Sequence, residues 1–403
     1  MSARSEPLRI RVSREVRVPD RLKLERYRHT PALGPRVLFF SGGTALRDCC
    51  SELVRYTHNS VHVITPFDSG GSSAVLRKAF AMPAVGDIRN RLMALADTSL
   101  QGNPEIFNLF AHRLSKTDTR EQLIAELESL ARGRHRLIAC VHDPMRKIIR
   151  NHFREFIERM PDDFDLRGAS LGNLVLTAGF LANRRHIDPV IFIFSKLVRV
   201  LGMVRPVVNK DLHLAVRLAD GKEIVGQHMI TGKESAPLQK SIADIWTVQS
   251  LDDPTPVQAT VRRKMKRLIG EADLICFPIG SFYTSVLANL LVAGVGSAVA
   301  ANACPKVYVP NTLPDPECVG LSVADLVERL LALLRRDAGA DAPVGSLLNA
   351  VLVDSRNANY PGGLKKKRIL ALGVEVIDLP LVQGDGSAGI DPEKLVPALM
   401  SLT

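Results

Sequence analysis

Residues 61–90 constrain the fold more than any other stretch of this chain. They open with a β-branched run at 61–65, break at Pro66, and pass through Asp68 into a glycine-serine turn that precedes helical spacing. This order is typical of a buried strand that leads into a helix through a tight turn. Backbone N–H groups at such a turn, together with the helix N-terminus, bind anions. The candidate anion-binding residues of this turn are Gly70, Gly71, Ser72 and Ser73.

The same arrangement of strand, small-residue turn and helix occurs at two other places. The apolar run 36–40 is followed by Gly42, Gly43 and Thr44, and the run 274–277 is followed by a hydroxyl-rich turn. The candidate binding residues of that second turn are Gly280, Ser281, Tyr283, Thr284 and Ser285. Neither turn matches the GxGxxG or the GxxxxGK[ST] fingerprint, so each can also be a ligand-free turn or a helix cap.

Two strands joined by one helix form a βαβ unit, which predicts a parallel sheet and an α/β fold. We expect a basic extension over 1–35, a nucleotide-binding core over 36–320 and an α/β segment over 321–403 that packs on the core. Residues 88–165 show mainly helical spacing, apart from a strand-like run at 136–141, and predict a helical insertion over one face of the sheet. The extension is interpreted as an arm or a strand followed by a linker.

Asp68 is the candidate catalytic and metal-binding residue, because it follows a strand directly and precedes an anion-binding turn. A carboxylate beside phosphate-binding loops suits a divalent cation or a polarised hydroxyl, although a ribose clamp and a helix cap are alternatives. Asp87, Arg89 and Asn90 combine acid, base and amide on one turn, and Arg89 can fork onto a phosphate. Asn173 and Asn311 stand at element ends, where an amide either reads a ligand or caps a helix.

Composition limits the partners. The net charge of +11 favours an anionic partner, but tyrosine and tryptophan are scarce and do not alternate with basic residues, so nucleic acid is not expected. No apolar run reaches the roughly 20 residues of a membrane span. The six cysteines show no Cys-x-x-Cys spacing, which suggests reduced thiols in a cytoplasmic protein. We also expect a homo-oligomer such as a dimer.

Taken together, these stretches resemble the CofD/YvcK family of 2-phospho-L-lactate transferases and gluconeogenesis-factor-like proteins. The resemblance covers roughly residues 36–320 and is carried by VLFFSGGTALRD, ITPFDSGGSSAVLR, VGDIRNRLMALAD, LGNLVLTA, ADLICFPIGSFYTSVLANLLVAGVGSAV and YVPNT. It implies a three-layer Rossmann-like parallel sheet that binds a nucleotide-diphosphate-linked small molecule. In the transferases the resemblance further implies Mg²⁺ and transfer of a phospholactyl-type group to a hydroxyl.

The resemblance also implies roles for individual residues. Gly42, Gly43 and Thr44 would line the phosphates, and Asp68 would be the acid on the metal side. Asp87, Arg89 and Asn90 would close over the diphosphate, and 280–285 would hold the nucleoside. The family usually has a second acid where this chain has Ser69.

Two functions of different classes therefore stay open at the level of sequence. The first is a transferase that moves a phosphoryl-linked group from a nucleotide-linked donor to a hydroxyl acceptor. The alternative is a non-catalytic, YvcK-like protein that binds a nucleotide sugar and acts as a regulator.

Overall fold

A seven-stranded sheet forms the centre of the computed structural model, which describes residues 15–99, 101–232, 236–383 and 389–403. The strand order is β10-β9-β8-β7-β1-β2-β3, and every neighbouring pair is parallel. The strands are β1 Val37–Ser41, β2 Val61–Ile64, β3 Met203–Pro206, β7 Leu274–Phe277, β8 Lys306–Tyr308, β9 Ala350–Val353 and β10 Glu375–Asp378. The α/β class and the parallel sheet predicted from the sequence are confirmed, and β9 and β10 extend the same sheet.

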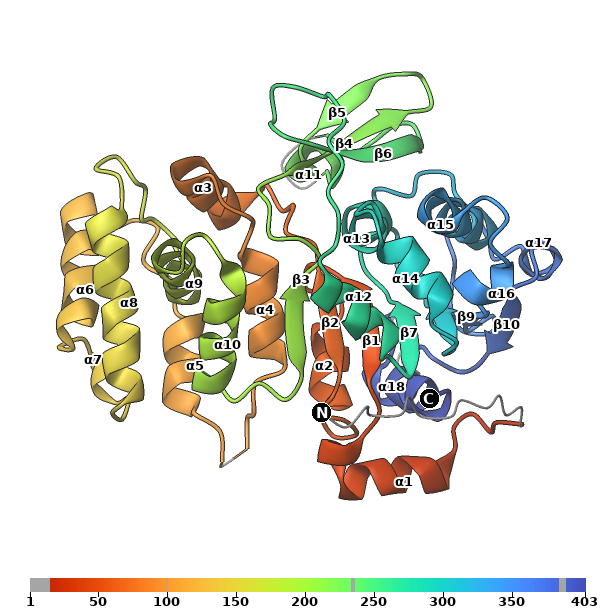
Figure 1. Cartoon of the computed structure of the whole chain (residues 1–403), viewed down its shortest axis with the longest axis horizontal. Helices are drawn as coiled ribbons and strands as arrows, with labels where there is room; N and C mark the ends of the chain where they lie inside the picture. The colour runs from red at the N-terminus through yellow and green to blue at the C-terminus, as the bar shows by residue number, and fades with distance from the viewer. Residues whose placement is uncertain (1–14, 100, 233–235, 384–388) are drawn as a thin grey trace, which may run out of the picture.

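The central strands are buried along their whole length because helices cover both faces of the sheet. Successive side chains of a strand point to opposite faces. In β1, Val37 and Phe39 therefore join one hydrophobic core, while Leu38 and Phe40 join the other. The result is the expected three-layer arrangement, seen in Figure 1.

One face carries the first core and most of the helical insertion. Its helices are α1 Arg21–His29, α2 Arg47–Leu53, α3 Gly71–Phe80, α4 Gly86–Ala94, α5 Pro104–Ala111, α6 Arg120–Arg132, α7 Arg136–Ala139, α8 Met145–Arg159, α9 Leu171–Ala182, α10 Ile187–Leu197 and α18 Pro392–Ser401. The helices α3 to α10 all lie between β2 and β3 in the chain, so the inserted layer continues beyond residue 165.

The opposite face carries the second core. Its helices are α12 Arg263–Gly270, the π-helical turn η2 Phe282–Leu287, α13 Ala288–Leu290, α14 Val295–Ala301, α15 Val323–Ala338, α16 Val344–Leu347 and α17 Lys366–Ala371. Gly294 adopts a left-handed φ of 92° at the start of α14, so the apolar stretch 287–302 does not form one continuous helix.

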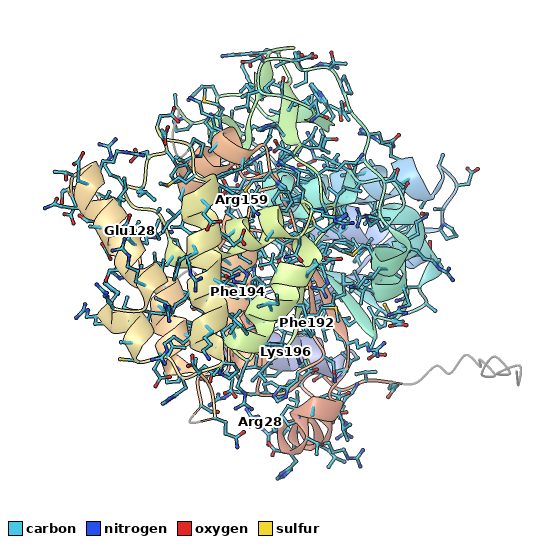
Figure 2. The ribbon with its side chains drawn as sticks, turned by 60° about the vertical axis from the view of Figure 1, so that its left-hand side comes forward. Arg28, Glu128, Arg159, Phe192, Phe194 and Lys196 are labelled. Atoms are coloured by element: carbon cyan, nitrogen blue, oxygen red, sulfur yellow. The ribbon has the colours of Figure 1, made fainter. Side chains whose placement is uncertain are left out.

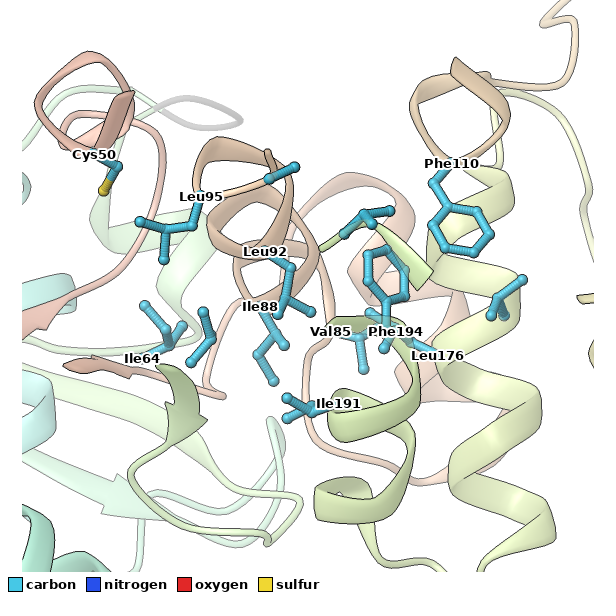
Figure 3. Packing of buried hydrophobic residues seen from close by; sticks show 14 of the residues in the cluster. Cys50, Ile64, Val85, Ile88, Leu92, Leu95, Phe110, Leu176, Ile191 and Phe194 are labelled. Atoms are coloured by element: carbon cyan, nitrogen blue, oxygen red, sulfur yellow. The ribbon is translucent and has the colours of Figure 1, made fainter. Parts of the chain in front are cut away.

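Helix α4 joins the inserted layer to the sheet. It buries Ile88 and Leu92 completely, and Figure 3 shows these side chains between Ile64 of β2 and the α9–α10 pair. Further out, the Phe110 and Phe194 rings lie 4.4 Å apart. This packing fixes the start of α4, and with it Asp87 and Arg89, against the end of the sheet.

The outer surface of the inserted layer is polar, as Figure 2 shows for Glu128, Arg159 and Lys196. Phe192 is a large exposed apolar side chain on this surface, and the Lys196 ammonium lies 5.5 Å from its ring centre. Within the ranges given above, each helix is too short or too polar to cross a lipid bilayer.

A small antiparallel sheet stands beyond the carboxyl end of β3, at the top of Figure 1. We call it the lid sheet. It consists of β4 His213–Leu218, β5 Glu223–Val225 and β6 Ile242–Val248, with α11 Gln227–Ile230 beside it. β4 and β5 form a hairpin, and β6 pairs with the other edge of β4.

Two local predictions were wrong. The strand-like run 136–141 forms α7, where the His135 side chain accepts a hydrogen bond from the Leu137 N–H and starts a helix. The N-terminal arm contains α1 rather than a strand; Asp20 caps it, and the Ser401 hydroxyl accepts a hydrogen bond from the Asp20 N–H. The first fourteen residues of the predicted basic extension lie outside the described residues.

The contact between α9 and α10 yields a test of the inserted layer. A Cβ at Gly179 would lie 2.2 Å from Val190 Cγ2, closer than side chains approach. We expect Gly179→Ala to separate these helices and to lower the free energy of unfolding by roughly 1–3 kcal/mol, measured by urea denaturation. The matched control is Gly270→Ala, where a Cβ meets nothing within 4 Å. Equal midpoints for the two variants would contradict this packing.

Candidate anion-binding site

The site lies at the carboxyl ends of β1 and β7, two neighbouring strands from which the chain continues in opposite directions across the sheet. From β1 the chain passes to its neighbour β2, whereas β7, on the other side of β1, leads outward to β8. Ligands of open parallel sheets bind at this switch point, beyond the carboxyl ends of the strands. The loops at 42–44 and 280–281 meet here, and the loop at 65–71 flanks them on the β2 side.

Gly42 occupies a crowded position, where a larger residue would require neighbouring side chains to shift. A Cβ there would lie 2.8 Å from Thr65 Oγ1 and 3.0 Å from Ser285 Oγ. The structure therefore brings the predicted residues Gly42 and Ser285 together. Gly43 has a φ of 51°, and its N–H donates to Asp87 Oδ2 over 2.7 Å, which ties the first loop to the start of α4. Thr44 follows and is exposed.

Three helices of the inserted layer begin beside this loop. The helices α3, α4 and α9 start at Gly71, Gly86 and Leu171, and each lacks a side-chain cap on its first turn. Such a first turn leaves N–H groups without intrahelical partners and carries the positive end of the helix dipole. Three uncapped N-termini in one place favour a bound anion.

Close contacts join these three N-termini. The Asn173 Nδ2 group donates to Ser72 Oγ over 3.1 Å, which links α9 to α3. A Cβ at Gly86 would lie 2.7 Å from Ser73 Oγ, so α4 touches α3. Asn173 is buried, and its Oδ1 atom has no hydrogen-bond partner among the described residues.

Asp68 lies at the edge of the same cluster and is half-buried. Its Oδ1 atom accepts the Gly70 N–H over 3.1 Å, and its Oδ2 atom lies 3.5 Å from the place of a Cβ on Gly86. The alternative interpretation of Asp68 as a helix cap is thus correct in part, because its carboxylate accepts a hydrogen bond from the Gly70 N–H of the same loop. It nevertheless faces the start of α4.

The side chains of the site could hold a metal ion only together with oxygen atoms supplied by a bound ligand. No group of three or more His, Cys, Asp or Glu side chains suited to a metal exists in the part of the chain that the structure describes. Mg²⁺ is commonly held by one or two carboxylates together with substrate phosphates and water. Asp68 can supply one such carboxylate, with the remaining oxygens coming from the ligand.

Arg89 is buried without a charged partner. Its side chain donates to Ser170 Oγ and to Asn90 Oδ1, both over 2.5 Å, and its Nε atom has no partner among the described residues. The residue is only 8% exposed. Burial, together with the smaller effect of the nearby Arg113 charge, lowers the pKa of Arg89 to about 10, while Asp87 opposes the shift.

Arg91, one half-turn further along α4, is buried even more completely, at 1% exposure. It donates to Cys50 Sγ over 2.7 Å and lies 3.5 Å from Ser41 Oγ. Burial raises the pKa of the Cys50 thiol, so this neighbour is a neutral group. Within the described ranges, neither Arg89 nor Arg91 forms an ion pair with a carboxylate.

These two arginines border a hollow of about 210 Å³, which we call the arginine pocket. Its lining includes Gly43, Thr44, Arg47, Arg89, Asn90, Arg91 and Arg113, with apolar walls from α4 and α5. Gly43, Thr44, Arg89 and Asn90 were predicted from the sequence. Arg47, Arg91 and Arg113 were missed, because single arginines in helical patterns carry no signal and Arg113 reaches the pocket only through the fold of the insertion.

The loop after β7 is organised by the chain's own acids. Asn311 accepts the Gly280 N–H over 2.8 Å and donates to its carbonyl over 2.7 Å, so it positions this loop. Asp315 accepts the Phe282 N–H, and Glu317 accepts the N–H groups of Tyr283 and Thr284. Burial raises the pKa of Glu317 to about 8, with the neighbouring Asp315 charge adding to the effect.

The predicted residues of this loop therefore separate into two groups. The Tyr283 hydroxyl donates to the carbonyl of Ile242 in the lid sheet, and the Thr284 hydroxyl donates to Glu317, so both point away from the arginine pocket. Gly280, with a φ of 139°, and Ser281 remain on the side of the first loop. Because carboxylates already occupy the amides at the start of η2, this turn has little capacity for a phosphate.

Hydrogen bonds connect the lid sheet and its adjoining segments to the loop that carries Asp68. Buried Arg77 donates to Asp211 over 2.6 Å and to the carbonyl of Asp68 over 3.0 Å, so it joins the two segments. Ser69, which stands where the family usually has a second acid, accepts the His228 N–H and lies 2.8 Å from His228 Nδ1. The lid sheet thus borders the predicted site.

Fold and site together define a Rossmann-like α/β protein with a basic candidate anion site at the switch point of its parallel sheet. The family model of 2-phospho-L-lactate transferase CofD matches residues 37–378, and the chain belongs to this family.

The relatives carry a different name. The gluconeogenesis factor of Bacillus subtilis is 29% identical over 73% of this chain and 74% of its own length. The gluconeogenesis factor of Listeria monocytogenes is 27% identical over 69% of this chain and 67% of its own length. A crystal structure of a UPF0052-family protein from Bacillus halodurans superposes with a TM-score of 0.65 at 24% identity, covering 91% of this chain and 99% of that chain. It shows the same fold.

His213, which contacts Arg77, predicts a pH dependence of stability. Burial lowers the pKa of His213 to about 4, with the charges of Arg77 and His228 adding to the effect. Between this value and the unfolded value of about 6.5, the unfolded state binds more protons, so stability is lost as the pH falls through that window.

We expect the urea midpoint to drop between pH 7 and pH 5, and to drop less in His213→Gln, which has no proton to gain. The exposed His29→Gln serves as the matched control, because its loss leaves the pH dependence as it is in the parent chain. An identical drop in His213→Gln and in the parent chain would show that this histidine is not held neutral.

Proposed function

We propose that this protein binds a nucleotide-diphosphate-linked small molecule, with the diphosphate at the arginine pocket and the nucleoside toward the β7 loop. The observation that carries the proposal is the pair of buried guanidinium groups, Arg89 and Arg91, that have only neutral partners. A buried charge without a counter-charge is costly, whereas a diphosphate brought beside it supplies the missing negative charge.

The surrounding backbone supports the same ligand. The uncapped N-terminus of α9, next to the Ser170 that holds Arg89, adds N–H donors and a positive dipole end on one side, and the backbone at Thr44 lies on the other. Arg89 can offer a planar pair of donors, which matches phosphate oxygens better than a lysine does. The buried Asn173 amide, with a free carbonyl oxygen, is suited to orient a hydroxyl or a base.

A thermal-shift series with GDP, UDP and a UDP-sugar, each with and without Mg²⁺, tests the binding proposal. A ligand that binds only the folded state stabilises it by RT ln(1 + [L]/Kd), so the melting temperature rises with concentration. We expect Arg89→Lys to weaken binding by about tenfold or more, because the bidentate donor pair is lost.

The control for that series is Arg132→Lys, a change of the same kind on the exposed end of α6. It should bind as the parent chain does. The binding proposal fails if no nucleotide shifts the melting temperature, or if Arg89→Lys and Arg132→Lys bind alike.

Transfer of a phosphoryl-linked group is the second candidate function, favoured by the CofD family match and by Asp68 at the edge of the site. In such a step the acceptor hydroxyl oxygen bonds to phosphorus while the bond from phosphorus to the nucleotide monophosphate breaks, and the hydroxyl proton is released. Asp68 would orient the acceptor or hold the cation, and Arg89 would stabilise charge on the leaving phosphate. When bound, Mg²⁺ would neutralise charge on the diphosphate.

The variant Asp68→Asn separates the two candidates. If the protein is a transferase, this change should abolish product formation from a 2-phospholactyl-type donor while melting temperature and nucleotide affinity stay close to those of the parent chain. Turnover retained in Asp68→Asn would overturn the role of this acid. Saturable binding by the parent chain without any product would favour the regulatory, YvcK-like function.

A further inference from the structure

A second basic concavity lies at the carboxyl end of β3, away from the arginine pocket. Two adjoining hollows of about 120 and 460 Å³ share Asp188, Asn209 and Arg262 on their walls. They lie between α10, β3 and α12, and no lining residue is common to them and the arginine pocket. We call this concavity the edge hollow, because β3 is the outermost strand of the large sheet.

The charges around the edge hollow are strongly unbalanced. Its basic lining residues are Arg184, Arg205, Lys210, Arg262 and Lys264. Asp188 is its acidic lining residue among the described residues, and it lies 3.8 Å from Arg205 Nε and 3.9 Å from Lys264 Nζ. Both distances are too long for good hydrogen bonds. One carboxylate therefore faces several cations, and the hollow keeps a net positive charge.

Two polar atoms in its wall are buried without a partner among the described residues. They are Arg205 Nε, a donor, and Asn209 Oδ1, an acceptor. The Asn209 Nδ2 group already donates to the carbonyl of Arg185 over 2.9 Å, which fixes the amide with its oxygen unused. Buried polar atoms are normally satisfied, so an unused donor and acceptor on one concave wall indicate a ligand that supplies both.

The floor is apolar. It is formed by Val207 and Val208 after β3 and by Met265 and Leu268 of α12. A basic rim over an apolar floor suits a molecule with a charged end and a less polar body. In the described ranges no Phe, Tyr or Trp lines either hollow, and His186 is the one aromatic ring there, whereas stacking surfaces for single-stranded nucleic acid depend on several aromatic side chains.

We propose that the edge hollow is a second anion-binding site, built for a small phosphorylated molecule whose phosphate contacts Arg205, Arg262 and Lys264 while its body lies on the apolar floor. This site is independent of the nucleotide site, and a failure of either proposal leaves the other standing. The Asn209 oxygen would accept a hydrogen bond from a hydroxyl of the bound molecule.

Isothermal titration calorimetry of the full chain with inorganic pyrophosphate tests the proposal. The parent chain should show two binding events. The double variant Arg262→Gln/Lys264→Gln should lose one of them, with an affinity reduced by about tenfold or more, and keep the event that Arg89→Lys removes. Lys210→Gln, on a different segment, should weaken the same event and remains informative if the double variant does not fold.

The matched control is Arg263→Gln/Arg267→Gln, which removes the same charge from the same helix at positions outside the hollow. It should retain both events. A titration of the parent chain that Arg262→Gln/Lys264→Gln leaves unchanged, or an equal loss in the control and in this double variant, would overturn the proposal. The proposal also fails if the double variant weakens binding of a DNA duplex but leaves the pyrophosphate titration unchanged, because the hollow would then be part of a nucleic-acid surface.

Discussion

Two buried guanidinium groups, whose hydrogen-bond partners among the described residues are all neutral, are the constraint around which this site is organised. Arg89 and Arg91 lie on one short helix, packed between the sheet and the inserted helical layer. Neutral hydroxyl, amide and thiol groups hold their positions but do not balance their charge. In the proposed function, a bound anion supplies the negative charge that these partners lack, and this links the position of α4 to the ligand.

The other parts of the site follow from this arrangement. The packing of Ile88 and Leu92 on the sheet fixes the rotation of α4, and this sets where Arg89 points. The bond between Gly43 and Asp87 brings the first loop to the same place. On the β7 side, Asp315 and Glu317 occupy the amides that a phosphate would otherwise use. In the proposed function, this arrangement favours the arginines over η2 as the phosphate site.

Sequence patterns predicted the parallel sheet and the loops at the carboxyl ends of its strands, because buried strands and glycine turns leave local signals. Gly42 is one such case, because a glycine turn directly after an apolar run can be recognised in the sequence. Its close contacts with Thr65 and Ser285 became visible only in the structure. Arg113 and Arg91 escaped prediction because their importance arises from burial and from contacts across the insertion. Tyr283 and Thr284 looked like ligand contacts, yet acids more than thirty residues later in the chain determine where they point.

The most direct measurement is a crystal structure of the protein with GDP or UDP bound. We predict diphosphate oxygens within hydrogen-bond distance of the Arg89 side chain and of the backbone at Gly43 and Thr44. A diphosphate bound instead at the start of η2, with Arg89 still contacting only Ser170 and Asn90, would contradict the central claim that the buried arginines form the phosphate site.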